Sequence, residues 1–423
     1  MERLDRTFRA ISFFSGLSYG MVLPVLFVFL KDKGISNVEL AVLALTATIT
    51  TTLLDLPSGN LADRYGRKLL FLIGQIPFLL FCVGITYAES FGALAAAMFL
   101  SGLSTALTSG TLDSLYVQKY NESKRSTSLQ SRLAGLSLFS LAGTLVGAGL
   151  GIGLGVLIDT TGDDRFIILQ DRLFLLVGAV ALALSAFVSA CVEEKSAVAT
   201  FDRAKMQGLD ELKVAFQASI AIFLRSRELI IVTGSGAIAA AAFMCFEKFW
   251  QIQVDQLTGE PVSRTIFYSF FCGGLMVSIV GQQLSVKLCE YFNDNLVRPV
   301  LLTRIMLVVA FAGLAFSSDM VTFGVCFVLI YLASAASASP VLALFHRYVP
   351  DDIRTSLLSI RSVSIQLGAS IGILLAGLVS YYVSLDMAFV SSALLYVVSA
   401  VVLAMNARIY RPRLQVEGYD ERA

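Results

Sequence analysis

Twelve separate stretches of this sequence are long and apolar enough to cross a lipid bilayer. A spanning helix needs about 20 predominantly apolar residues, and in lipid every backbone polar group has to be satisfied inside the segment. The stretches therefore predict helices, and the sequence as a whole predicts an all-α membrane protein. The predicted helices cover residues 8–30, 38–58, 69–88, 92–117, 131–158, 171–191, 229–251, 265–288, 297–317, 320–345, 356–382 and 385–407.

Composition supports lipid as the solvent of this chain and excludes several classes of function. Of 423 residues, 56% are apolar and only 15% are charged, whereas soluble domains carry about 25% charged residues. The net charge of +1 gives no strong positive potential that would attract nucleic acid. The single histidine, His346, and six cysteines without ligand spacing exclude a zinc or iron centre. We therefore expect free thiols, no metal, no cofactor, no catalytic residues and no enzyme.

Lysine and arginine are distributed unevenly between alternate loops. If the N-terminus is cytoplasmic, the loops expected outside hold only Lys31, Lys33, Arg165 and Arg264, and the other basic residues of the loops and termini fall inside. Cytoplasmic loops are enriched in these residues. The sequence thus predicts a multi-pass protein of the cell inner (plasma) membrane with both termini in the cytoplasm.

The longest loop divides the twelve helices into two sets of six. We predict an N-terminal half over residues 1–191, a linker with an amphipathic cytoplasmic helix over 192–228, a C-terminal half over 229–410 and a tail over 411–423. A short internal repeat supports this division. Arg125 and Arg132, near the start of the fifth helix, match Arg354 and Arg361, near the start of the eleventh, at the same offset of 229 residues.

The loop between the second and third helices reads Gly59-Asn-Leu-Ala-Asp63-Arg64-Tyr-Gly66-Arg67-Lys68. Glycines permit a tight connection. An aspartate can accept hydrogen bonds from the N–H groups at a helix N-terminus, and the planar guanidinium of an arginine can bind a carboxylate through two hydrogen bonds. A plain cytoplasmic stop sequence would explain the basic residues but not the glycines or the aspartate.

This loop resembles the cytoplasmic signature G-x-L-a-D-r-x-G-r-k of the major facilitator superfamily (MFS) of secondary transporters. The resemblance implies the MFS fold, twelve transmembrane helices in two six-helix halves with alternating access between them. It also implies a gate, in which Asp63 meets the start of the eleventh helix near Thr355 and Arg67 meets Asp113. The preceding Asp55-Leu-Pro-Ser-Gly59 is similar to a subset rich in efflux proteins.

Other segments match the superfamily less fully. After the eighth helix, Gly281 and Leu284 remain but the acid and second glycine of the loop are missing. Met98 stands where many proton-coupled members carry an arginine. The run Gly143–Gly155 resembles an antiporter signature without its proline, and it is equally consistent with a helix-packing face.

Ionisable residues inside a span are costly, so they are functional candidates. Asp55 is either a proton site or a helix-end carboxylate, and Glu247 either carries the coupling proton or lies at the membrane interface. Lys248 and Trp250 also fit an interfacial position. The candidate residues for coupling and for the substrate cavity are Glu247, Asp55, Trp250, Gln251, Tyr19 and Gln366.

The expected function is transport of a small organic molecule by alternating access, as proton-coupled efflux of a drug, a metabolite or a siderophore. The alternatives are a proton-coupled uptake permease and, in a different class, a non-transporting membrane receptor. We expect a monomer whose partners are the lipid bilayer, a small-molecule substrate and a proton, without nucleic acid.

Overall fold

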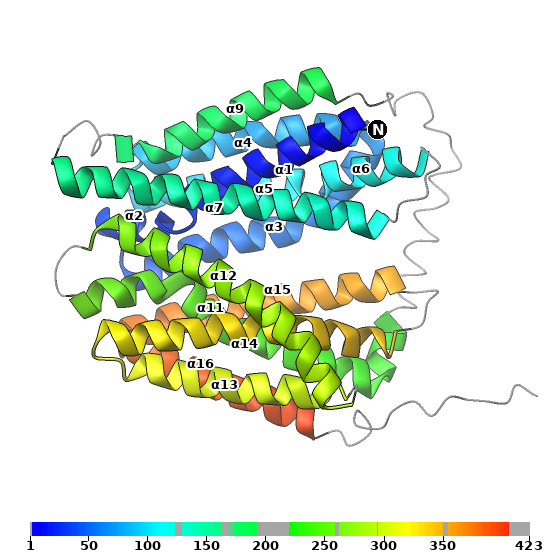
Figure 1. Cartoon of the computed structure of the whole chain (residues 1–423), viewed down its shortest axis with the longest axis vertical. Coiled ribbons are helices and arrows are strands. Elements are labelled where there is room, and N and C mark those ends of the chain that lie inside the picture. Colours follow the sequence, from blue (N-terminus) through cyan, green and yellow to red (C-terminus); the bar gives the residue numbers. More distant parts are fainter. Residues whose placement is uncertain are drawn as a thin grey trace, which may run out of the picture. The chain divides into compact units, whose positions relative to one another are not determined.

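A computed structural model of the protein describes residues 2–122, 129–162, 169–170, 172–192, 194, 220–258, 262–293, 295–349 and 354–405. Within these ranges the regular elements are helices (Figure 1). They are α1 (Glu2–Val22), α2 (Leu26–Asp32), α3 (Asn37–Tyr65), α4 (Arg67–Tyr87), α5 (Phe91–Thr108), α6 (Thr111–Glu122), α7 (Leu129–Thr161), α9 (Leu173–Cys191), α11 (Arg227–Thr258), α12 (Arg264–Tyr291), α13 (Val297–Ala315), α14 (Met320–His346), α15 (Arg354–Tyr382) and α16 (Leu385–Ala404).

The described helices provide 12 segments long and apolar enough to cross a membrane. Each coincides with one predicted stretch, which confirms the all-α membrane fold. The six cysteines all lie in the described ranges, and none of them is joined in a disulfide there, as expected. The predicted amphipathic helix of the linker falls mostly on residues 195–219, which lie outside the described residues, and so does the tail over 411–423.

Two of the spans are interrupted where the sequence predicted continuous helices. The first span, Leu4–Asp32, breaks between α1 and α2 at residues 23–25, because Pro24 has no N–H group to continue the helix. The fourth span, Phe91–Tyr120, breaks between α5 and α6. There Gly110 has φ 64°, a left-handed conformation that favours glycine.

The chain forms two compact units. The first comprises Met1–Lys205, Lys248–Gly273 and Ser380–Tyr382, and the second comprises Met206–Glu247, Gly274–Val379 and Val383–Ala423. A buried cluster in the first unit includes Phe8, Phe71, Leu112, Leu115, Tyr116, Leu136 and Val188. A cluster in the second includes Leu229, Val232, Val297, Val300, Leu344, Phe345, Leu357 and Leu403.

Each unit contains a pair of helices in backbone contact through small residues. In the first unit, an added Cβ at Gly143 or Gly147 of α7 would overlap the Phe13 or Leu17 carbonyl of α1. In the second, a Cβ at Gly368 or Gly372 of α15 would overlap backbone carbonyls of α11. Close approach through small residues is a common way for helices to associate in lipid.

Candidate functional site

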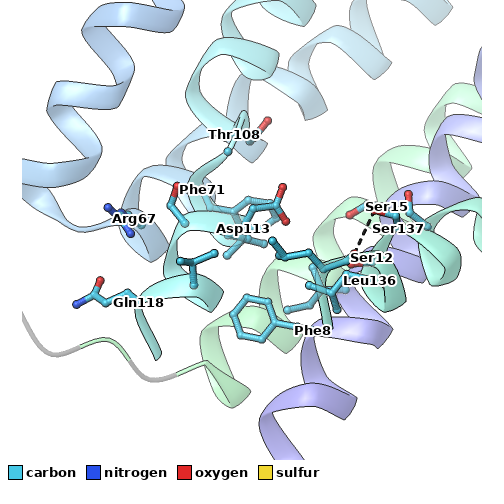
Figure 2. Close-up of a pocket in the computed structure, with 17 residues that line it drawn as sticks. Phe8, Ser12, Ser15, Arg67, Phe71, Thr108, Asp113, Gln118, Leu136 and Ser137 are labelled. Atoms are coloured by element: carbon cyan, nitrogen blue, oxygen red, sulfur yellow. Dashed lines mark hydrogen bonds between the residues drawn. The ribbon is translucent and has the colours of Figure 1, made fainter. Parts of the chain in front are cut away.

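The first unit contains a cavity of about 1030 Å³ beside the connection between α3 and α4. We call this end of the unit the inner end, after the predicted orientation. Side chains from α1, α4, α5, α6 and α7 line the cavity (Figure 2). They are Phe8, Ile11, Ser12, Ser15, Arg67, Phe71, Thr108, Leu112, Asp113, Ser114, Val117, Gln118, Leu133, Leu136, Ser137 and Ser140, with Gly110 at the break.

The cavity combines apolar walls with hydroxyl groups and two charged residues. Arg67 and Gln118 lie on one side, Ser12, Ser15 and Ser137 lie on the other, and Asp113 lies between them (Figure 2). Apolar walls with a few polar groups are typical of small-molecule sites. This arrangement can bind an organic molecule by hydrogen bonds and apolar contact.

The break at Gly110 positions Asp113. Because a new helix begins at Thr111, Asp113 lies in the first turn of α6, where a negative charge complements the helix dipole. The Thr111 hydroxyl donates to the Thr108 carbonyl at 2.7 Å and connects the two helix ends. The Asp113 side chain is exposed to the cavity.

The predicted gating loop forms a tight turn around Gly66. This glycine ends α3 and precedes α4 with φ 102°, a conformation rarely adopted by residues with a side chain. The Glu194 carboxylate then accepts hydrogen bonds from the Arg67 and Lys68 N–H groups, at 2.9 and 2.8 Å. Free N–H groups and the helix dipole make this terminus an anion site. The Lys68 ammonium donates to the Ser189 carbonyl at 2.8 Å.

Arg67 and Asp113 both line this cavity. Gly59 lies on an exposed part of α3. Asp63 and Arg64 belong to α3, but their side chains lie outside the described part of the chain. The gating role of this set therefore remains a prediction.

A buried charged cluster lies at the same end of the unit. Asp5 is 5% exposed and accepts from the Tyr116 hydroxyl at 2.8 Å, while Arg132 donates to its other carboxylate oxygen. These contacts connect α1, α6 and α7. We did not predict the cluster, because the sequence alone gives no reason to pair Asp5 with a residue 127 positions away.

The remaining candidate residues occupy three kinds of surroundings. Asp55 and Tyr19 are exposed, whereas Glu247 and Gln366 are half-buried. Trp250 is 3% exposed and Gln251 is 2% exposed. The Trp250 ring lies near Phe267 and Phe270, with centroids 6.1 and 6.2 Å away. Both residues are enclosed by protein here, and their predicted place in a substrate cavity remains a prediction.

Two charged residues with defined surroundings were missed by the sequence analysis. Glu194 lies shortly after the sixth span, Leu173–Cys191, and this position near the end of a span was the signal that could have identified it. Arg304 lies inside the α13 span and is 6% exposed. Its guanidinium lies 5.4 Å from the centre of the Tyr396 ring, and its Nε has no hydrogen-bond partner among the described residues.

Twelve spans with a cavity beside a glycine-rich, charged connection are features of a membrane transporter. The family model of the Major Facilitator Superfamily matches residues 10–293 and 276–418, and the chain belongs to this superfamily. It is therefore a multi-pass membrane transporter of a small molecule, and not an enzyme.

Similar proteins agree with this assignment. Over 408 residues the chain is 24% identical to a multi-drug resistance efflux pump PmrA homolog of Lactococcus lactis, covering 94% of this chain and 93% of that protein. It is 21% identical to the MFS-type transporter YxaM of Bacillus subtilis, covering 97% and 98%. The crystal structure of the nucleoside transporter NupG matches with a TM-score of 0.75 at 13% identity, covering 97% of this chain and 100% of that chain.

Proposed function

We propose that this transporter exports a small organic molecule in exchange for protons, in a plasma membrane with both termini in the cytoplasm. The observation that carries the proposal is the cavity, in which hydroxyl groups, apolar walls, Arg67 and Asp113 meet at the signature loop. The full-length similarity to a protein named as an efflux pump supports export. A second relative supports it over a shorter stretch, since 96 residues are 32% identical to the quinolone resistance protein NorA of Staphylococcus aureus, covering 21% of this chain and 25% of that protein.

In this proposal, Gly59, Asp63, Arg64, Gly66, Arg67, Lys68 and Asp113 form the gating site at the inner end. The turn at Gly66 sets the direction of α4 and so places Arg67 on the cavity. An arginine and an aspartate on one cavity can pair in one access state and separate in another. A contact made in only one of two states shifts the equilibrium between them.

Glu247 is the proposed carrier of the coupling proton, and Asp55 is the second candidate. Both lie within spans, where carboxylates are rare and mark proton paths. Asp113 is assigned to Arg67, and Asp5 in the first span is already bonded to Tyr116 and Arg132, so Glu247 and Asp55 are kept as the candidates. Glu247 is half-buried and lies near the buried Phe246 and Phe249 in the sequence of α11, while Asp55 is exposed on α3. Predicted topology places Glu247 toward the outside, where an exporter loads its proton.

The test is flux of a fluorescent organic cation in proteoliposomes under an imposed pH difference. Metabolite profiling of cells and medium, with and without the protein, supplies further substrates. We expect wild type to drive the dye against its gradient, and Glu247→Gln to lose this accumulation while keeping exchange of dye for dye. If the Glu247→Gln protein still accumulates the dye against its gradient, Asp55 becomes the proposed carrier of the coupling proton. Flux in the opposite direction would favour an uptake permease.

A further inference from the structure

Tyr268 of α12 occupies a defined site in the first unit. The segments Lys248–Gly273 and Ser380–Tyr382 belong to this unit together with helices α1 to α7 and α9. They lie at the end where α2 and α7 finish, which we call the outer end. Tyr268 is 1% exposed, and its hydroxyl donates to the Met21 carbonyl at 2.8 Å. Buried tyrosines usually need such a partner.

The break in the first span is what makes the Met21 carbonyl available. In a continuous helix the N–H of residue 25 would donate to the carbonyl of residue 21. Here the Val25 N–H donates to Val22 instead, at 3.2 Å, because Pro24 disrupts the helix. The Tyr268 hydroxyl therefore replaces a backbone donor that the first span lacks.

The ring of Tyr268 lies on Gly151, within the glycine run of α7. An added Cβ at Gly151 would overlap the ring, and one at Gly155 would overlap the Thr265 hydroxyl. At Gly149 and Gly153 an added Cβ would meet nothing within 4 Å. Thus Gly143 and Gly147 pack α7 against α1, whereas Gly151 and Gly155 receive side chains of α12.

Polar contacts surround this site at the outer end. Arg264 pairs with Asp32 at 3.3 Å, and Ser263 donates to Asp159 at 2.7 Å. At the end of α15, Ser380 accepts from the Asn37 amide at 2.7 Å. The Arg264–Asp32 pair is partly exposed, and such pairs contribute little, whereas Tyr268 is buried.

We propose that Tyr268, seated on Gly151 and bonded to the Met21 carbonyl, sets how readily the outer end of the transporter opens. The inference rests on the proposed alternating access, since a residue with this role has to release its contacts when the outer side opens. It assigns distinct roles to two pairs of glycines within one helix. The inner pair maintains permanent packing, and the outer pair forms a releasable contact.

The chain carries its own reporter for this site. Trp250 is the only tryptophan in the sequence, it is buried, and its ring lies near Phe267 and Phe270, which belong to the same helix as Tyr268. Acrylamide quenching of Trp250 fluorescence, in the full-length protein reconstituted in nanodiscs without substrate, reports opening of the outer end.

Tyr268→Phe removes only the hydroxyl and leaves a buried carbonyl unsatisfied, which typically shifts an equilibrium by about tenfold. We expect Tyr268→Phe and Gly151→Ala to raise quenching and to shift the emission to the red.

Matched variants separate this role from general loosening. Gly153→Ala on the same helix and Tyr381→Phe, whose side chain is exposed, are expected to quench like wild type. A second readout is the disulfide between Asn37→Cys and Ser380→Cys in a cysteine-free chain. We expect its formation to slow several-fold with Tyr268→Phe, although neither position contacts the substituted hydroxyl.

Wild-type quenching and unchanged cross-linking in a folded Tyr268→Phe protein would overturn the proposal. An equal effect of Gly153→Ala and Gly151→Ala would overturn the assignment of the glycine pairs. If the Gly151→Ala protein does not insert into the membrane, Tyr268→Phe alone tests the proposal, because this substitution adds no atoms to the packed site. Since no substrate is used, a positive result together with dye flux that does not depend on the pH difference would refute the proposed proton-coupled export and leave the role of Tyr268 intact.

Discussion

Glu194 is the residue that holds the start of α4 in place. Its carboxylate accepts from both the Arg67 and the Lys68 N–H groups, and an added Cβ at Gly66 would lie 3.0 Å from one of its oxygens. Glycine at position 66 therefore allows both the turn and the close approach of the carboxylate. The direction of the Arg67 side chain depends on this contact, because Arg67 is the first residue of the helix.

Glu194→Ala should loosen the connection between α3 and α4. Hydrogen bonds to a charged group contribute about 1.5–3 kcal/mol each when buried, and Glu194 is half-buried, so we expect a loss of about 2 kcal/mol. The measurement is the rate of trypsin cleavage at the Arg64–Lys68 segment in inside-out vesicles, expected to rise at least tenfold. Glu290→Ala, which changes an exposed acid at the end of α12, is the control. Equal cleavage of both variants would contradict the role of Glu194.

The gating role is tested on Asp63, Arg67 and Asp113. Asp63→Asn or Arg67→Ala should reduce transport severalfold while membrane insertion stays normal, because each removes an interaction that favours one access state. Exchange of Arg67 and Asp113 should restore part of the activity if the two side chains pair. Dye flux in proteoliposomes is the measurement, and wild-type flux in both single variants would refute the gate.

At the scale of elements, the spans were predictable from the sequence and their interruptions were not. Apolar length alone predicts a span, and a break of two or three residues changes this signal little. Pro24 and Gly110 were visible, yet both residues also occur inside membrane helices, and Pro57, Pro77 and Pro340 lie within continuous helices here. The break at Gly110 places Asp113 on the cavity. The position of the site therefore depended on a backbone detail that apolar length does not determine.

The glycine run of α7 was interpreted in two ways from the sequence, as an antiporter signature or as a packing face. The structure supports packing for Gly143 and Gly147, which contact the backbone of α1. The offset of 229 residues that relates Arg125 to Arg354 also relates Gly143 to Gly372, and Gly372 contacts α11 in the second unit. The short repeat thus extends to an equivalent helix contact in each unit.

Gly143→Ala should destabilise the protein, because the added methyl group would overlap a backbone carbonyl that belongs to a helix and moves little. Overpacking typically costs about 1–3 kcal/mol. We expect a lower midpoint of thermal unfolding in detergent, and a similar loss for Gly372→Ala. Gly149→Ala adds the same group to the same helix with nothing within 4 Å, and it should unfold like wild type. A loss equal to that of Gly143→Ala would show that helix flexibility, rather than contact, matters.

At the scale of the whole molecule, composition and the signature loop predicted the family, but contacts between distant residues were not predictable. Asp5 with Arg132 and Met21 with Tyr268 are pairs separated by 127 and 247 positions. Neither pair has a spacing or motif that marks it. Such contacts depend on how helices pack, which apolar composition constrains only loosely because most residues in a span are interchangeable in lipid.

The orientation of the molecule in the membrane follows from charge and is open to a direct test. Within the first unit, Asp159 contacts Ser263, and Asp32 pairs with Arg264, so the ends of α2 and α7 lie on the same side of the membrane. Few basic residues occur in the loops at this end, and the positive-inside rule then places it outside.

In a cysteine-free chain, Thr161→Cys should react with an impermeant thiol reagent added to intact cells, because residue 161 is exposed. Lys119→Cys, near the inner end, should react only after permeabilisation. Labelling of residue 161 from the cytoplasmic side alone would reverse the topology, and with it the assignment of Glu247 to the side on which an exporter binds its proton.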